Sequence, residues 1–400
     1  MSAGHKAGRP GAPALVRTTP SNPALRHVLT HLITPLLMCL GMGLAYLGAF
    51  VSPEPHHLPV AVVGAGPEAK VFAQTIQDKA NGAATANTAG AAGKAGDKLD
   101  VRTVPDRATA VDQLKSRDIT GAYVLDAKTP ELIVASAGSD MSATAVEKIF
   151  TPVATAQGAP LKITDVVPPV SGDPTGSGIF FLLIAVSIGS YASVAVLGAA
   201  GAGLTLRTRA GLVAGVSFVV SLIGAAFAGP LFHLVDHGLW GVWAMAWLYS
   251  AGILFLGVGL HTFLKRWTTL GVMVLFVMLN FTSSGGLFRP ELQNGFFGGL
   301  HAFWNGAGLL EGIRDLVYFG GHGLARDVWV LIAWLVLGLA VMMISGAVER
   351  RRTPAAEVTR SETPMTSPAP AASTVPPATA ATAGAAEAAE EEEIEEAVGV

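Results

Sequence analysis

The sequence predicts an α-helical integral membrane protein with six transmembrane helices and an α/β extracytoplasmic domain between helices 1 and 2. Its composition indicates a membrane protein, because 51% of the 400 residues are hydrophobic and only 14% are charged, far from the balance of a soluble domain. A membrane span needs about 20 apolar residues, and the charged residues leave six uncharged intervals of that length. These intervals are residues 26–54, 173–207, 209–236, 236–265, 266–289 and 327–349.

Lysine and arginine predict the orientation, since short cytoplasmic loops are enriched in both. If the N-terminus is cytoplasmic, every short basic loop falls on the cytoplasmic side. Those loops carry Lys6, Arg9, Arg17, Arg26, Arg207, Arg209, Lys265, Arg266, Arg350, Arg351, Arg352 and Arg360. Both termini are therefore expected in the cytoplasm, with residues 52–175 on the opposite side of the membrane.

Residues 1–26 form the expected cytoplasmic N-terminal segment, and residues 27–51 form the first transmembrane helix. The apolar run of this helix, residues 32–51, is longer than the hydrophobic region of a signal peptide and follows 26 polar residues. An uncleaved anchor is therefore expected rather than a cleaved leader.

The extracytoplasmic domain, residues 52–175, alternates strand-like apolar runs with helical ones. Strands are expected at residues 58–63, 100–104, 121–125, 131–136 and 161–167, and helices at 67–79, 107–117 and 141–156. Residues 81–96 are almost all Ala, Gly, Thr and Asn, a composition typical of a flexible surface loop. The run VAVVGAGPEA at residues 60–69 matches a dinucleotide-binding fingerprint. The acidic residue that should bind the ribose is absent, so no cofactor is expected.

The transmembrane bundle, residues 176–348, contains the other five expected helices. The loop at residues 204–211 returns at the cytoplasmic face. No apolar run carries a charged residue, so a proton relay has no obvious carrier. His233, Asp236 and His237 lie in one turn, where interfacial capping is favoured over a metal site. Cys39 is the single cysteine, which excludes a disulfide within the chain.

Residues 280–321 are too rich in glycine for a plain span and too apolar for a solvated loop. A re-entrant or interfacial segment is expected, because irregular backbone at membrane depth needs protein or a water-filled cavity around it. The break is interpreted as an outer gate, formed by Ser283, Ser284, Gly285, Gly286, Glu311 and Arg314. The last two lie three residues apart and are expected to pair on one helix face, as a surface ion pair worth under about 1 kcal/mol. The alternative is an ordinary hairpin with aromatic anchors.

The end of the chain has a composition of its own. After Arg352 it is rich in Pro, Ala, Thr and Ser, and it contains seven glutamates from Glu387 to Glu396. Such a segment cannot bury a core, so residues 349–400 are expected to form a disordered acidic cytoplasmic tail. No basic face with interleaved aromatic residues is present, and nucleic acid is not an expected partner.

Two pairs of motifs carry a resemblance to a known family. LNFTSSGGLFRPEL at residues 279–292 precedes LEGIRDLVYFGG at 310–321, and LPVAVVG at 58–64 precedes VPDRATAVDQLKSRDITGAYVLD at 104–126. With its order of one span, an outer domain and five spans, the chain resembles the membrane subunits of type 2 ABC transporters (ABC-2 type permeases). The resemblance is to the phage-infection-protein-like branch and covers about residues 25–352.

This resemblance implies a multi-pass protein of the bacterial plasma membrane, surrounded by membrane lipid. It also implies pairing with a second permease subunit, as a homo- or heterodimer, and with a separate cytoplasmic ABC ATPase. The chain has no GxxxxGK[ST] phosphate loop, so the ATPase must be another chain. Arg207 and Arg209, in the loop at residues 204–211, are then the expected ATPase contact.

Two function classes remain. The favoured one is the permease of an ATP-driven exporter that works by alternating access at a dimer interface. The alternative is a non-transporting membrane receptor or envelope scaffold whose outer domain binds a partner or a phage. No nucleophile, base and orienting acid cluster near one membrane face, so an enzyme is not expected, and no catalytic, cofactor or metal residues are assigned.

Overall fold

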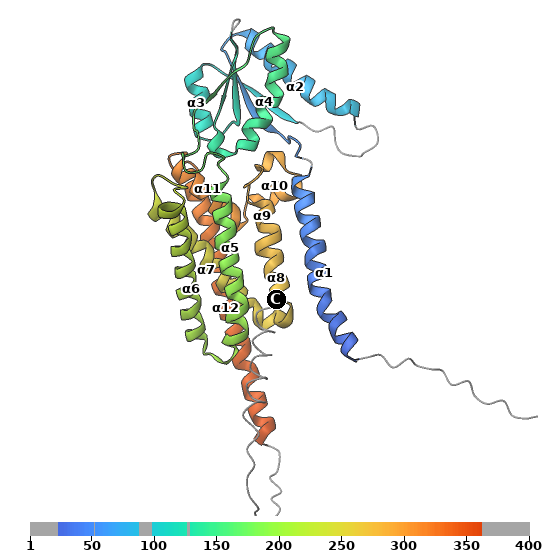
Figure 1. The fold of residues 1–400 in the computed structure, drawn as a ribbon, viewed down its shortest axis with the longest axis vertical. Coiled ribbons are helices and arrows are strands. Elements are labelled where there is room, and N and C mark those ends of the chain that lie inside the picture. Colours follow the sequence, from blue (N-terminus) through green and yellow to red (C-terminus); the bar gives the residue numbers. More distant parts are fainter. Residues whose placement is uncertain (1–22, 52, 88–97, 126–128, 362–400) are drawn as a thin grey trace, which may run out of the picture.

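A computed structural model describes residues 23–51, 53–87, 98–125 and 129–361. An α/β domain lies at one end of a bundle of long helices (Figure 1). In the described part, five helical stretches are long and apolar enough to cross a membrane: Leu32–Phe50, Gly178–Ala200, Leu206–Leu231, Leu239–Ser283 and Leu324–Arg351. The chain therefore has the architecture of a multi-pass membrane protein with a small α/β domain. We call the end of the bundle next to this domain the domain end, and the other the far end.

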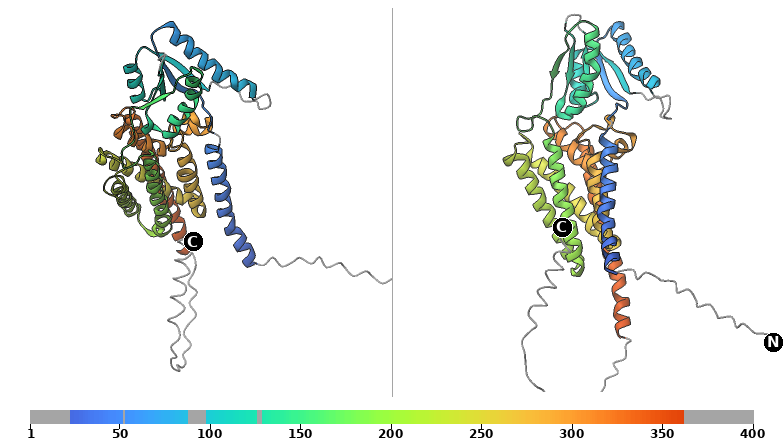
Figure 2. Two further views of the ribbon diagram at one scale, coloured as in Figure 1. Left: turned by 45° about the horizontal axis from the view of Figure 1, so that its top comes forward. Right: turned by 45° about the vertical axis from the view of Figure 1, so that its right-hand side comes forward.

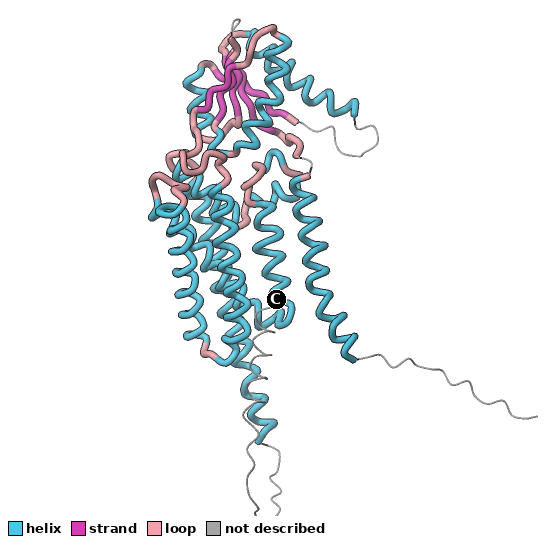
Figure 3. Tube along the Cα trace, viewed as in Figure 1, coloured by secondary structure: helices cyan, strands magenta, loops and turns pink. Residues whose placement is uncertain are grey.

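The α/β domain is built on a five-stranded sheet with the strand order β2-β1-β3-β4-β5 (Figure 3). The strands are β1 (Leu58–Val63), β2 (Leu99–Val104), β3 (Gly121–Val124), β4 (Glu131–Val134) and β5 (Lys162–Asp165). β1 pairs in parallel with β2 and β3, β3 pairs with β4 antiparallel, and β4 pairs with β5 in parallel. β1 is a continuous apolar run because helices cover both of its faces.

Helices cover the two faces of the sheet. α2 (Pro67–Asn87) and α4 (Asp140–Ala156) pack on one face, and α3 (Arg107–Lys115) packs on the other. Val60 and Val62 belong to the first core, whereas Ala61 and Val63 belong to the second. This alternation is that of a pleated strand.

The strands and helices predicted in this domain are confirmed, with shifts at their ends, but the loop expected at residues 81–96 is partly wrong. α2 continues through Asn87, and residues 88–97 lie outside the described residues. Asn81 helps to explain the difference, because its side-chain Oδ1 accepts hydrogen bonds from the backbone N–H groups of Lys98 (2.8 Å) and Leu99 (3.3 Å). A contact with the start of β2 thus holds a helical segment that has no periodic apolar face.

α1 (Pro23–Phe50) lies apart from most of the bundle. It packs along the π-helical segment η5 (Val274–Met278) and α9 (Leu279–Ser283), as two further views show (Figure 2). At the domain end the Asn294 side chain donates to the carbonyl of Gly48 at 3.0 Å. Leu36 and Leu44 are 67% and 68% exposed, a pattern that suits a helix facing lipid.

The remaining helices of the bundle pack around α7 (Leu239–Leu264). They are α5 (Gly178–Ala200), α6 (Leu206–Ala226) with the π-helical η3 (Phe227–Leu231), the short α8 (Thr268–Met273) and α12 (Leu324–Ser361). α7 and α12 approach backbone to backbone at Gly338, where a Cβ atom would lie 2.9 Å from the amide nitrogen of Leu256. Small residues at such crossings are what allow membrane helices to associate closely.

The stretch Leu239–Ser283 contains 45 residues and includes two of the intervals that the sequence separates. Lys265 interrupts its helical path with a φ of 48°, which lies outside the right-handed helical region. The three-residue turn η4 (Lys265–Trp267) follows, and the Thr268 hydroxyl donates to the carbonyl of Lys265 at 2.6 Å. α8 then packs against α7, so the chain bends sharply at this point.

The loop predicted at residues 204–211 is shorter than expected. α6 already begins at Leu206, and the side chain of Thr205 accepts the N–H of Thr208 at 3.3 Å as its N-terminal cap. Arg207 and Arg209 therefore lie in the first turn of a helix rather than in a loop. The threonine before this run is a recognisable cap signal.

The predicted tail begins as a helix. α12 continues through Ser361, so the first part of residues 349–400 is helical rather than disordered. Most residues of the run after the last span are Glu, Arg and Ala, which favour a helix, although the run also contains Pro354. The glutamate-rich end lies outside the described residues.

Candidate functional site

The helix break predicted after span five lies at the domain end of α9. α9 ends at Ser283, and Gly285 adopts a φ of 80°, a conformation that residues with a side chain resist. A Cβ atom on Gly285 would lie 2.8 Å from Glu311 Oε1, and one on Gly286 would overlap the ring of Phe180 on α5. Both positions require glycine. Gly285 has a positive φ and close neighbours, whereas Gly286 is constrained by its contact with Phe180 alone.

After the break the chain turns back into the bundle. η6 (Pro290–Leu292) and α10 (Gly295–His301) lead to Trp304, whose indole N–H donates to the carbonyl of Leu275 at 3.1 Å. Leu275 lies eight residues before Ser283, which corresponds to about 12 Å along a helix axis. α11 (Asn305–Val317) follows, and all of its residues except Leu316 are buried. The returning segment thus packs back against the helices before the break and is not laid flat across the end of the bundle.

The carbonyl groups at the break are satisfied by side chains from this returning segment. The donors are Gln293 Nε2 to Thr282 O (2.8 Å), His301 Nδ1 to Ser283 O (3.0 Å), Arg314 Nη1 to Gly285 O (2.9 Å) and Arg314 Nη2 to Gly286 O (3.3 Å). Burial lowers the pKa of His301, so its ring is neutral at neutral pH and Nδ1–H is the donor. Such partners are what permit irregular backbone at membrane depth.

Arg314 and Glu311 form the ion pair that the sequence predicts, with Arg314 Nη1 at 3.2 Å from Glu311 Oε1. The pair is not on a surface, however, because the Arg314 and Glu311 residues are 1% and 6% exposed. Sequence reasoning placed it on an exposed helix face, since the Glu-x-x-Arg spacing says nothing about which side of α11 is covered. All six residues of the predicted gate lie within one cluster of contacts.

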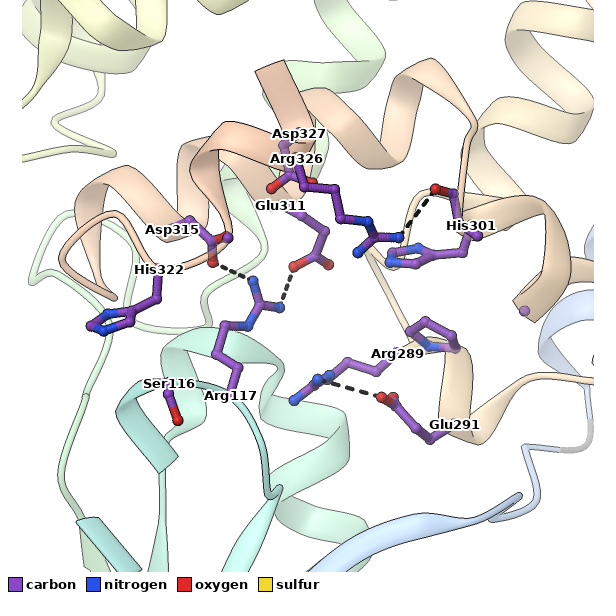
Figure 4. Close-up of a pocket in the computed structure, with 14 residues that line it drawn as sticks. Ser116, Arg117, Arg289, Glu291, His301, Glu311, Asp315, His322, Arg326 and Asp327 are labelled. Carbon is purple, nitrogen blue, oxygen red and sulfur yellow. Dashed lines mark hydrogen bonds and ion pairs between the residues drawn. The ribbon is translucent and has the colours of Figure 1, made fainter. Parts of the chain in front are cut away.

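Arg117 joins the α/β domain to this cluster, and no sequence motif predicted it. It follows α3 with a φ of 65°, and its guanidinium group lies between two acids of α11 (Figure 4). Arg117 Nη1 lies 2.6 Å from Asp315 Oδ1, and Nη2 donates to Glu311 Oε2. The same guanidinium lies 5.0 Å from the centre of the Phe319 ring. We call Arg117, Glu311, Arg314 and Asp315 the domain-end cluster.

The charges of the domain-end cluster are balanced, with two arginines and two carboxylates. Burial opposes ionisation of Glu311, but Arg117 and Arg314 outweigh it and lower its pKa to about 2. Burial likewise opposes the charge of Arg117, but Glu311 and Asp315 raise its pKa. Burial raises the pKa of Asp315, although Arg117 works against this effect. Glu311 is therefore the carboxylate that is most firmly ionised.

A cavity of about 400 Å³ lies beside this cluster, between the α/β domain and the returning segment with α10 and α11. Its walls carry both signs of charge, and the dashed contacts in Figure 4 show that most of these groups bind one another. The charged lining residues are Arg117, Arg289, Arg326, Glu291, Glu311, Asp315 and Asp327. Among the residues that line this cavity, three buried polar atoms have no hydrogen-bond partner: Arg117 Nε, Arg289 Nε and Glu291 Oε2. The cavity is polar enough to fill with water and has room for a small ligand.

The two residues predicted to contact an ATPase lie at the far end and differ from each other. Arg207 is exposed, whereas Arg209 is 5% exposed and its Nη1 lies 3.1 Å from Glu349 Oε1 on α12. The guanidinium group of Arg209 is therefore directed into the bundle. Only Arg207 is exposed for a partner in this arrangement.

His233, Asp236 and His237 are the residues weighed from the sequence as a metal site. His237 Nδ1 lies 2.5 Å from Asp236 Oδ1 on the exposed turn after η3. Over the described residues, no group of three or more His, Cys, Asp or Glu side chains could hold a metal ion.

No family model, curated protein or solved structure matches this chain. The sequence motifs and the geometry at the two ends of the bundle are therefore the basis for a function.

Proposed function

We propose that the chain is the permease subunit of an ATP-driven exporter of the bacterial plasma membrane, acting as a dimer with a separate ABC ATPase. Both termini are cytoplasmic in this proposal, and the α/β domain lies outside the cell. Two motifs carry the resemblance to ABC-2 permeases. Residues 279–292 contain α9 and the break, and residues 310–321 contain the second half of α11.

The proposal includes six spans, with Leu239–Ser283 counted as two. As one straight helix its 45 residues would extend over roughly 68 Å, about twice the thickness of the hydrocarbon core. The bend at Lys265 gives two shorter arms, and it places Lys265 and Arg266 at the far end with the other basic residues. That distribution supports a cytoplasmic far end.

The observation that carries the proposal is the contact of Arg117 with α11. Arg117 connects the α/β domain to Glu311, and Glu311 pairs with Arg314, which binds the carbonyls of Gly285 and Gly286. A displacement of the domain therefore acts on the break through a short chain of buried ionic contacts. A gate at the extracytoplasmic mouth requires such a connection between the domain and the helices. A receptor domain that is only attached to the membrane does not require it.

A thiol-accessibility experiment tests the proposal without a known substrate. In a Cys39→Ser background, Ala302→Cys places a thiol in the wall of the 400 Å³ cavity. The protein is reconstituted in liposomes with the ATPase that co-purifies from native membranes. We expect ATP to change the rate of reaction of this thiol with an impermeant reagent, because the domain end opens or closes during the cycle.

The matched control is Ser171→Cys, on an exposed loop of the α/β domain, whose reactivity should not respond to ATP. In an Arg117→Gln variant the effect of ATP on thiol reactivity at position 302 should fall, since the domain loses its ion pairs with Glu311 and Asp315 of α11. If no ATPase co-purifies, or if ATP leaves position 302 unchanged, the exporter is contradicted and the receptor or scaffold remains.

A further inference from the structure

The far end of the bundle contains a second cavity, of about 250 Å³, between α5, α6, α7 and α12. Its polar lining comes from Arg209, His261, Thr262, Lys265 and Glu349. Three of these side chains are basic and one is acidic. If only Arg, Lys, Asp and Glu are counted, this cavity has two basic groups and one acidic group, whereas the cavity at the domain end has three basic and four acidic groups.

Arg209 is the most buried of these groups, and its charge is only partly compensated. Its Nη1 pairs with Glu349, but its Nε is buried without a hydrogen-bond partner. Arg209 also lies in the first turn of α6, which contains no acidic residue. Because a helix N-terminus carries a partial positive charge, the helix adds to the charge of Arg209 instead of offsetting it.

Glu349 is already committed to other groups. Its Oε1 lies 3.1 Å from Arg209 Nη1 and accepts the hydroxyl of Thr262 at 2.7 Å. This single carboxylate therefore holds α6, α7 and α12 together. It cannot also neutralise Lys265, which makes no ion pair with any described residue.

His261 presents a nitrogen to the same cavity. The hydroxyl of Thr268 donates to the carbonyl of Lys265 at 2.6 Å, and it lies 3.1 Å from His261 Nδ1. Since the hydroxyl proton is used, Nδ1–H must donate to the threonine oxygen. Nε2 is left without a partner among the described residues and, because Nδ1 carries the proton of the neutral ring, it can accept a hydrogen bond from a further group.

We propose that this cavity binds a phosphate group. Arg209 supplies positive charge from the first turn of α6, whose N-terminus adds a partial positive charge, and Lys265 supplies it from the end of α7. His261 Nε2 can accept a hydrogen bond from a hydroxyl of the ligand. A phosphate oxygen accepts from arginine and lysine, and basic pockets between transmembrane helices bind the headgroups of anionic phospholipids. The source is an anionic phospholipid or a soluble phosphate compound. This site is independent of the ABC assignment.

The test measures the thermal stability of the full chain in a nonionic detergent. Phosphatidylglycerol, phosphatidylcholine and inorganic phosphate are titrated separately, the last against sodium chloride at matched ionic strength. We expect a dose-dependent rise in Tm with phosphatidylglycerol and not with phosphatidylcholine. Lys265→Gln should weaken the apparent affinity roughly fivefold, the effect of one basic residue near a phosphate headgroup.

The matched control is Arg266→Gln, because Arg266 stacks on Trp267 at 5.5 Å and does not line the cavity. It should titrate like the unmodified chain. A rise with inorganic phosphate that Lys265→Gln weakens and Arg266→Gln keeps supports the site and identifies a soluble source. The site is overturned if Lys265→Gln and Arg266→Gln respond alike. It is also overturned if neither phosphatidylglycerol nor inorganic phosphate raises Tm.

Discussion

The two ends of the bundle deal with buried charge in opposite ways. The domain-end cluster pairs two arginines with two carboxylates, and all four residues lie inside the protein. At the far end, the one carboxylate of the cavity, Glu349, has a side chain that is 38% exposed and pairs with Arg209. Lys265 lines the same cavity and makes no ion pair with a described residue. The domain end is therefore electrostatically complete without a ligand, whereas the far end has a net positive charge.

This difference affects stability. Removing one member of a buried ion pair leaves the other charge without compensation, which costs about 3–5 kcal/mol. An ion pair between two solvent-exposed side chains is worth no more than about 1 kcal/mol, and a pair with one exposed partner lies between these two limits. We therefore expect substitutions at the domain end to be much more damaging, although both ends contain an arginine and a glutamate in contact.

Arg314→Ala should have the largest effect. It removes one of the two arginines that pair with Glu311 and leaves the carbonyls of Gly285 and Gly286 without their donors, so we expect a loss of about 3–5 kcal/mol of stability. Thermal unfolding in detergent measures the loss. Arg326→Ala is the control, since Arg326 is exposed and, within the described residues, its side chain makes one hydrogen bond, to Ala302 O. Equal losses in the two variants would contradict the buried cluster.

Acid should weaken the domain end through Glu311. Its pKa is lowered to about 2 from an ordinary 4.5, so its stabilisation is present above the higher value and is lost as pH falls toward the lower one. Between about pH 6 and about pH 3 the loss should be on the order of 2 kcal/mol. Thermal unfolding across this range should show it.

A Glu311→Gln variant separates Glu311 from the other groups that titrate, since it removes only this carboxylate. Asp315 acts in the opposite direction, because its raised pKa makes protonation favour the folded state. The variant should therefore lose less stability in acid than the unmodified chain. A pH profile that Glu311→Gln leaves unchanged would show that Glu311 is not the group responsible.

Gly286→Ala should destabilise by about 1–3 kcal/mol, the usual cost of overfilling a packed site. The added methyl overlaps the Phe180 ring, so Phe180→Leu in the same chain should recover part of the loss. Thermal unfolding of the two single variants and the double variant measures this coupling. Strictly additive losses would mean that the contact between α5 and the break is not the cause.

Local patterns in the sequence were sufficient for much of the fold. The apolar run of β1 gave the correct strand, and the spacing of Glu311 and Arg314 gave a correct pair, because both depend on neighbours along the chain. Arg117 was not predictable in this way, since its partners Asp315 and Glu311 are 198 and 194 residues away. The burial of Glu311 and Arg314 was missed for the same reason, because the groups that cover them, among them Arg117 and the backbone of the break, lie far away in the sequence.

Arg209 shows the same limitation at the far end, and it leads to the smallest predicted effect. The positive-inside pattern treated Arg207 and Arg209 alike, but a helix turns by about 200° over two residues, so the two side chains point in different directions. Glu349→Gln removes the carboxylate and keeps an acceptor for the hydroxyl of Thr262. Because the Glu349 side chain is 38% exposed, water can replace part of its contact with Arg209, so the loss should be smaller than that of Arg314→Ala and close to that of an exposed pair, about 1 kcal/mol. If phosphate binds here, the same variant should bind phosphatidylglycerol more tightly, since an acidic group leaves the cavity. A loss as large as that of Arg314→Ala, measured by thermal unfolding, would show that the two ends are built alike after all.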